Sequence, residues 1–161
     1  MGHIPEQQTR SVLKVVRACA DGTLVSAQPS PYQVRYDPRL PAAPTLANSL
    51  LFAFAVEQQA AAQDYLTLLR GASPQETFQL WCAAAVVEEA GPFWIVIPEQ
   101  SEHYPEYWNR RYHLLQGDES VPPSHIRHGW RAEGVLCSLI LLERCIDCGR
   151  DGERATKGRC S

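Results

Sequence analysis

Three cysteines near the C-terminal end have a spacing that could hold a metal ion. Cys145 and Cys148 are separated by two residues, and Gly149 follows them directly. This arrangement is typical of a zinc knuckle, in which a tight turn lets two thiolates converge on one ion. Cys160 supplies a third thiolate. We therefore expect one structural zinc ion, held by three cysteines and a histidine.

The fourth zinc ligand must come from outside these cysteines. In its spacing the tail resembles half of a zinc ribbon, so a histidine elsewhere in the fold has to complete the site. His128 is our candidate, with His125 and His113 as alternatives. Two other interpretations stay open: a disulfide or redox role for the cysteines, and no function in these thiols. The predicted metal ligands are Cys145, Cys148, Cys160 and His128.

Residues 103–131 concentrate side chains that recognise partners. This segment holds four of the five His, two of the four Trp and three of the six Tyr, together with four Arg. Interleaved Arg and aromatic side chains can grip phosphates and stack on bases, or they can anchor a protein partner. The predicted binding residues are Trp108, Arg110, Arg111, Arg127 and Arg131.

The same segment has a plainer interpretation. Its aromatic side chains could be core, with the arginines in solvent on the opposite face. Four carboxylates in or next to the segment cancel the four arginine charges, which favours that interpretation; they are Glu102, Glu106, Asp118 and Glu119. Sequence alone leaves both alternatives open.

Motifs of the common enzyme classes are absent from the sequence. It contains no dinucleotide-binding, phosphate-loop, serine-hydrolase or zinc-protease signature. Ser11 and Lys14 match the serine–lysine spacing of penicillin-recognising enzymes, but neither companion motif occurs and both residues lie in a predicted strand. We expect no catalytic activity from these residues.

Composition and charge describe an ordinary globular chain. Of its 161 residues, 45% are hydrophobic and 20% are charged, with a net charge of −3. This charge predicts no general attraction to nucleic acids or anionic membranes. The most apolar stretch, 46–56, is about half the roughly 20 residues that a membrane span needs. With no secretory signal in the first residues, the sequence predicts a soluble, cytoplasmic protein.

Local patterns predict a small β element followed by helices. Residues 11–19 are rich in β-branched side chains, and Asp21-Gly22 predicts a hairpin leading to Leu24 and Val25. Ser73-Pro74-Gln75-Glu76 has the form of a helix capping box, which predicts a helix from Ser73 to the Gly91-Pro92 break. Further helices are expected over 45–70, 105–115 and 124–144, with a short strand at 93–97.

The sequence thus predicts a mainly helical α+β fold. Residues 1–144 would form one domain of packed helices with a small N-terminal β element, and residues 145–161 a Cys-rich tail with the zinc knuckle. The leading functional hypothesis is a non-enzymatic binding or regulatory protein that acts through protein–protein contact. The alternative is a nucleic-acid-binding regulator that uses 103–131 and the zinc-stabilised tail. The third hypothesis is an enzyme whose motif is not recognisable.

Overall fold

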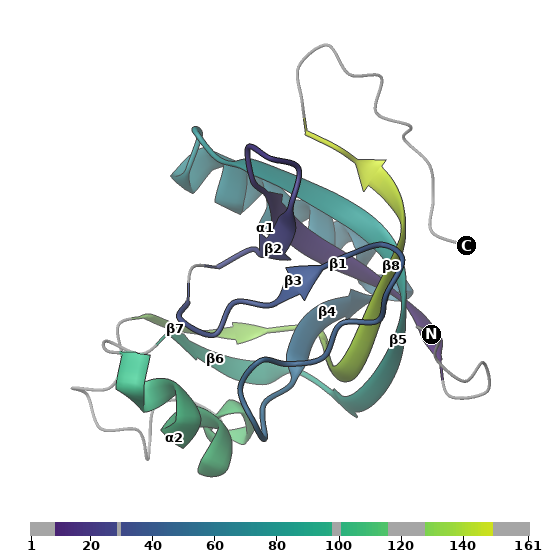
Figure 1. Cartoon of the computed structure of the whole chain (residues 1–161). Coiled ribbons are helices and arrows are strands. Elements are labelled where there is room, and N and C mark those ends of the chain that lie inside the picture. The colour runs from purple at the N-terminus through teal and green to yellow at the C-terminus, as the bar shows by residue number, and fades with distance from the viewer. Residues whose placement is uncertain (1–8, 29, 98–100, 116–127, 150–161) are drawn as a thin grey trace.

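Strands dominate the protein. The computed structural model describes residues 9–28, 30–97, 101–115 and 128–149 (Figure 1). Within these ranges the chain forms a six-stranded sheet in the order β3-β2-β1-β4-β8-β5 and a two-stranded sheet of β6 and β7. The strands are β1 (Arg10–Ala18), β2 (Leu24–Ser26), β3 (Arg35–Tyr36), β4 (Leu51–Ala55), β5 (Thr77–Ala90), β6 (Phe93–Ile97), β7 (His128–Ala132) and β8 (Val135–Asp147).

Four strands of the large sheet close on themselves. β1 pairs antiparallel with β5 over its whole length, and its residues Val12 and Leu13 also pair with β4. β4 pairs with β8, and β8 pairs with β5, which completes the ring. The register between β5 and β8 shifts at four places, and such bulges bend long strands. Both strands are visibly curved in Figure 1.

The helix α1 (Gln59–Ala72) covers one face of this ring. Its buried residues Ala62, Leu66 and Leu69 recur at helical spacing and form one apolar stripe. They pack on Leu13 and Phe54 in one of the two clusters of the large core. The other cluster lies on the opposite face of β1, where Val12 and Val16 contact the far side of the ring.

A smaller lobe is built on β6 and β7. The short helix α2 (Tyr104–Asn109) lies at the end of the molecule away from α1 (Figure 1). Tyr107 of α2 donates a hydrogen bond to the carbonyl of Trp94 in β6, at 2.9 Å. Tyr107 and Tyr112 form the buried centre of this lobe, with Trp94 and Trp108 packed against them.

The predicted mainly helical fold is wrong. The segment expected to be a helix from Ser73 is β5, and the expected helix over 124–144 contains β7 and β8. Residues 73–76 form a turn instead of a helix start, with the Glu76 N–H donating to the Ser73 carbonyl at 3.0 Å. In β5 the buried side chains alternate from Phe78 through Leu80 to Cys82, which is the period of a strand.

Several local predictions are confirmed. The N-terminal hairpin turns at Asp21-Gly22, where Gly22 has a φ of 90° that favours glycine. The strand predicted at 93–97 is β6. Of the segment expected to be a helix over 45–70, only the part from Gln59 onward is α-helix, as α1, because Leu51–Ala55 forms strand β4. No helix in the described ranges is long and apolar enough to cross a membrane.

Candidate ligand-binding groove

Two adjoining cavities lie between the strand ring, α1 and the smaller lobe. The larger has a volume of about 390 Å³ and the smaller about 210 Å³. Because seven residues line both cavities, the two adjoin, and we refer to them together as the groove. The shared residues are Gln28, Ser30, Phe52, Phe54, Tyr65, Tyr104 and Trp108.

Aromatic side chains make up most of the shared wall. Phe52 and Phe54 meet edge to face at 5.1 Å between ring centroids, and Tyr65 of α1 lies 5.9 Å from Phe54. Trp108 of α2 is supported by Tyr107 at 5.0 Å. Such edge-on packing holds the rings in fixed orientations. The groove therefore offers an apolar surface made from α1, β4 and α2.

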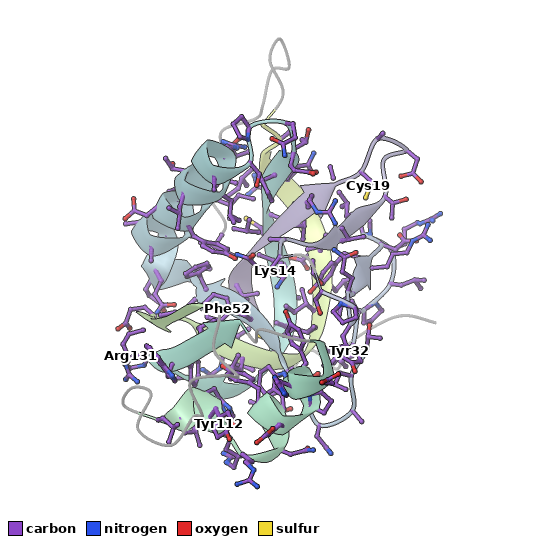
Figure 2. The ribbon with its side chains drawn as sticks, turned by 90° about the vertical axis from the view of Figure 1, so that its left-hand side faces the viewer. Lys14, Cys19, Tyr32, Phe52, Tyr112 and Arg131 are labelled. Carbon is purple, nitrogen blue, oxygen red and sulfur yellow. The ribbon has the colours of Figure 1, made fainter. Side chains whose placement is uncertain are left out.

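Lys14 lies at the inner end of the smaller cavity. Residues in a strand alternate between faces, so Lys14 shares the inner face of β1 with Val12 and Val16. Its Nζ donates a hydrogen bond to the Phe52 carbonyl at 2.5 Å and lies 5.5 Å from the centre of the Tyr36 ring. Burial lowers the pKa of Lys14 from 10.5 to about 8. Figure 2 shows Lys14 and Phe52 near the middle of the molecule.

The side chains around Lys14 supply no negative charge at neutral pH. Burial raises the pKa of the Cys137 thiol to about 12, although the ammonium of Lys14 acts in the opposite direction. Burial also raises the pKa of the Tyr36 hydroxyl. Within the described ranges, no carboxylate forms an ion pair with Lys14, and the buried Tyr36 hydroxyl has no hydrogen-bond partner.

The two ends of the groove differ in charge. Lys14 is the one charged residue among the described residues that line the smaller cavity. Asp64 and Glu133, both exposed, are the charged residues that line the larger one. The groove therefore runs from a buried cation to two carboxylates in solvent.

Ser11 and Lys14, whose spacing we did not expect to mean a catalytic pair, do not meet in the structure. Ser11 is exposed and Lys14 is buried, because three residues along a strand place the two side chains on opposite faces. Lys14 was thus noticed in the sequence for a pairing that the strand geometry prevents. The informative signal was its position between Val12 and Val16 on the apolar face of the strand.

The predicted zinc ligands are brought together only in part. Cys145 and Cys148 are free thiols whose sulfur atoms are 2.8 Å apart, and burial raises the pKa of Cys145. His128 lies in β7, paired with Ile97, whereas Cys145 is near the end of β8. Cys160 lies outside the described residues, as does His125, and His113 is buried against Glu89.

In the ranges that the structure describes, no group of three or more His, Cys, Asp or Glu could hold a metal ion. The predicted zinc ion therefore stays a prediction, because its third thiolate is not among these residues. The Cys-rich tail was expected to begin at residue 145, yet β8 continues to Asp147 and pairs with β5 there.

The predicted Arg-aromatic surface divides into two parts. Trp108 lines both cavities, so this one predicted binding residue belongs to the groove. The exposed arginines have partners within the smaller lobe or beside it: Arg110 pairs with Glu106 at 3.4 Å, Arg111 with Glu89 at 3.5 Å, and Arg131 donates to the Leu115 carbonyl at 2.6 Å. In Figure 2, Arg131 lies toward the edge of the molecule. Arg127 lies outside the described residues.

Comparison with known proteins supplies no relative for this chain. No protein-family model, no curated protein and no solved structure matches it. The functional argument therefore rests on the contacts, volumes and charges of the groove.

Proposed function

We propose that this protein is a non-enzymatic binding protein that holds a small amphipathic molecule in the aromatic groove. The observation that carries the proposal is that the two cavities adjoin along a shared wall that includes Phe52, Phe54 and Trp108. The larger cavity, at about 390 Å³, falls within the range of about 300–1,000 Å³ that is typical of small-molecule sites. Such sites are mainly apolar with a few placed polar groups, which is the composition found here.

Binding has better support than catalysis. A lysine with a shifted pKa in a pocket is also a feature of active sites. Acid–base or nucleophilic chemistry, however, needs a second group that takes up or gives a proton. Tyr36 and Cys137, the titratable neighbours of Lys14, are both held neutral by burial. Among the described residues around Lys14 there is thus no ionised partner to work with it, and Asp64 and Glu133 line the other cavity.

Contact through the arginines of 103–131 has less support as a function. Arg110 and Arg111 are each paired with a carboxylate, so the region offers little uncompensated positive charge to an acidic protein or to a nucleic acid. The proposed regulatory role is compatible with the groove, because a ligand bound between α1 and α2 touches both lobes of the protein.

A cavity-filling substitution tests the proposed function. Ala61 lines the larger cavity, whereas the neighbouring Ala60 of the same helix is exposed. The uncharged fluorescent probe N-phenyl-1-naphthylamine should bind the wild-type protein saturably, at one molecule per chain. Ala61→Phe should weaken this binding at least about tenfold, or about 1.4 kcal/mol. Ala60→Phe, the matched control, should leave it unchanged.

Two results would count against the proposal. Probe binding that never saturates would indicate general surface adsorption. Equal affinity in wild type, Ala61→Phe and Ala60→Phe would place the probe outside the groove. Circular dichroism of all three proteins checks that each substitution leaves the fold intact.

A further inference from the structure

We infer that the ligand of the groove carries a carboxylate head, which pairs with Lys14 and accepts a hydrogen bond from Tyr36. This inference rests on the proposed function and names the class of ligand: an amphipathic monocarboxylic acid. The head would lie in the smaller cavity, with the apolar body along Phe52 and Trp108 in the larger one.

Lys14 carries a positive charge that no carboxylate among the described residues compensates. An ammonium group has three N–H donors, and here one donates to the Phe52 carbonyl while the Tyr36 ring lies 5.5 Å away. Buried charges in proteins are nearly always paired, because removal from water disfavours an isolated ion strongly. A carboxylate in the cavity would provide the missing opposite charge.

The part of the chain that the structure describes does not supply that charge. The titratable groups nearest to Lys14 are Tyr36 from β3 and Cys137 from β8, and both are neutral at physiological pH. Glu88 of β5 acts on Cys137 and not directly on Lys14, and its carboxylate accepts a hydrogen bond from Ser138 at 2.7 Å. Because the described residues offer no such anion, we assign the anion that complements Lys14 to a bound molecule.

The Tyr36 hydroxyl gives another argument for a carboxylate. It is buried, lines the same cavity as Lys14 and has no hydrogen-bond partner among the described residues. A buried hydroxyl without a partner is disfavoured, so each such group calls for an explanation. A carboxylate has two oxygens and accepts several hydrogen bonds at once. One head group can thus satisfy the ammonium and the hydroxyl together.

The charges that line the two cavities favour a carboxylate over a phosphate. A phosphate carries more negative charge and is usually held by arginine or by several donors. Lys14 is the one cationic residue among the described residues of either cavity. Asp64 and Glu133 at the other end repel an anion, so the head is directed inward and the apolar body outward.

Three probes that differ only in their head group test the inference. Decanoate, decanol and decylamine share one alkyl chain and carry a negative, a neutral and a positive head. In calorimetric titrations near pH 7, wild-type protein should bind decanoate about tenfold more tightly than decanol. Decylamine should bind more weakly than decanol, because its charge repeats that of Lys14.

Substitutions at Lys14 and Tyr36 give the matched controls. Lys14→Met keeps an unbranched side chain of nearly the same length and removes the charge, so the preference for decanoate over decanol should disappear. Tyr36→Phe keeps the ring and removes the hydroxyl, so the preference should shrink but persist. Circular dichroism of all three proteins checks that the fold is intact, and Ala60→Phe, which lies outside both cavities, should keep the wild-type preference for decanoate.

A measurement on the wild-type protein makes the test independent of these variants. Decanoate affinity should fall as the pH rises from about 7 to about 9, because Lys14 loses its charge in this range, while decanol affinity should stay constant. Equal affinity for decanoate and decanol, or a preference that survives in Lys14→Met, would overturn the carboxylate assignment alone. Failure of decanol and the naphthylamine probe to bind at all would overturn the proposed function.

Discussion

The surroundings of Lys14 in the interior differ from those of Arg110 and Arg111 at the surface. The arginines are exposed and paired with carboxylates, whereas Lys14 is buried and pairs with none of the carboxylates that the structure describes. At the surface, Arg110 and Arg111 are 69% and 59% exposed, and each faces a carboxylate. In the interior, Lys14 is 8% exposed and faces aromatic rings, a carbonyl and a neutral thiol. Among the described residues, neighbouring carboxylates thus neutralise Arg110 and Arg111, whereas Lys14 has no counter-ion.

The energies of the two regions differ accordingly. Exposed ion pairs stabilise a protein by about 0–1 kcal/mol. The fall in the pKa of Lys14 from 10.5 to about 8 corresponds to a cost of about 3 kcal/mol for keeping it charged in the folded state. A charge held at such a cost is characteristic of functional sites. The informative residue is therefore the buried Lys14, rather than the concentration of arginines in 103–131.

The largest expected effect on stability comes from adding a methyl group at Gly134, next to the Phe52 ring in the wall of the groove. A Cβ atom added at Gly134 would lie 2.6 Å from the Phe52 ring and 2.8 Å from the Ala53 carbonyl. Gly134→Ala must therefore displace either the aromatic wall or the β4 backbone, and overpacking of this kind costs about 2–3 kcal/mol. Urea unfolding should show this loss, and naphthylamine binding should weaken with it.

Gly71→Ala is the matched control for this substitution. Gly71 lies in α1, and a Cβ atom there meets nothing within 4 Å. Because alanine is favoured over glycine in a helix, Gly71→Ala should stabilise the protein slightly, by up to about 1 kcal/mol. If both variants unfold at the same urea concentration as the wild type, Phe52 is not held in the position from which it shapes the groove.

The sequence predicted the parts of the fold that local chemistry determines. The N-terminal hairpin was found because Asp21-Gly22 follows a run of β-branched residues, and β6 because an apolar run follows the Gly91-Pro92 break. β5 and β8 were missed for a physical reason. Their residues are rich in alanine and leucine, which favour helix in isolation. They become strands because each pairs with the other and with β1 or β4, far away in the sequence.

The candidate site was less predictable than the fold. Trp108 was predicted to be a binding residue because tryptophan concentrates interface energy, and the structure places it in the wall of both cavities. Lys14 and Tyr36 were not selected, since their meeting depends on β1 and β3 lying on either side of β2. The groove is formed by residues from α1, α2 and several strands, and no short window of sequence contains that arrangement.

The next effect in size concerns the pH dependence of stability. The folded state lowers the pKa of Lys14, so the unfolded state binds more protons and the protein gains stability as the pH rises through about 8. Between about pH 7 and about pH 9 this gain is about 1 kcal/mol. Lys14→Met should lack this gain in stability. The difference between wild type and Lys14→Met therefore reports on Lys14 alone, because the thiols, whose effect on stability has the opposite sign, are present in both proteins.

Urea unfolding of both proteins at these two pH values measures the effect. The thiol of Cys137 has a raised pKa, which reduces stability above about pH 9, so the comparison should not extend beyond that value. A wild-type protein whose stability changes with pH in the same way as Lys14→Met would mean that Lys14 is solvated, and the contrast between interior and surface would vanish.

The smallest effect is expected at the surface. Arg110 is 69% exposed and pairs with Glu106 one helical turn away, so Arg110→Ala should cost less than about 1 kcal/mol. Glu106 retains a partner after this change, because the Tyr112 hydroxyl donates to it at 3.1 Å. The small loss should disappear at high salt, where exposed ion pairs are screened.

Decanoate affinity of Arg110→Ala should equal that of the wild type, since Arg110 does not line either cavity. Urea unfolding at low and high salt, with one decanoate titration, covers all three points. A loss of decanoate affinity in Arg110→Ala comparable to that in Lys14→Met would mean that surface charge steers the ligand, and the division between a neutralised surface and a charged interior would have to be given up.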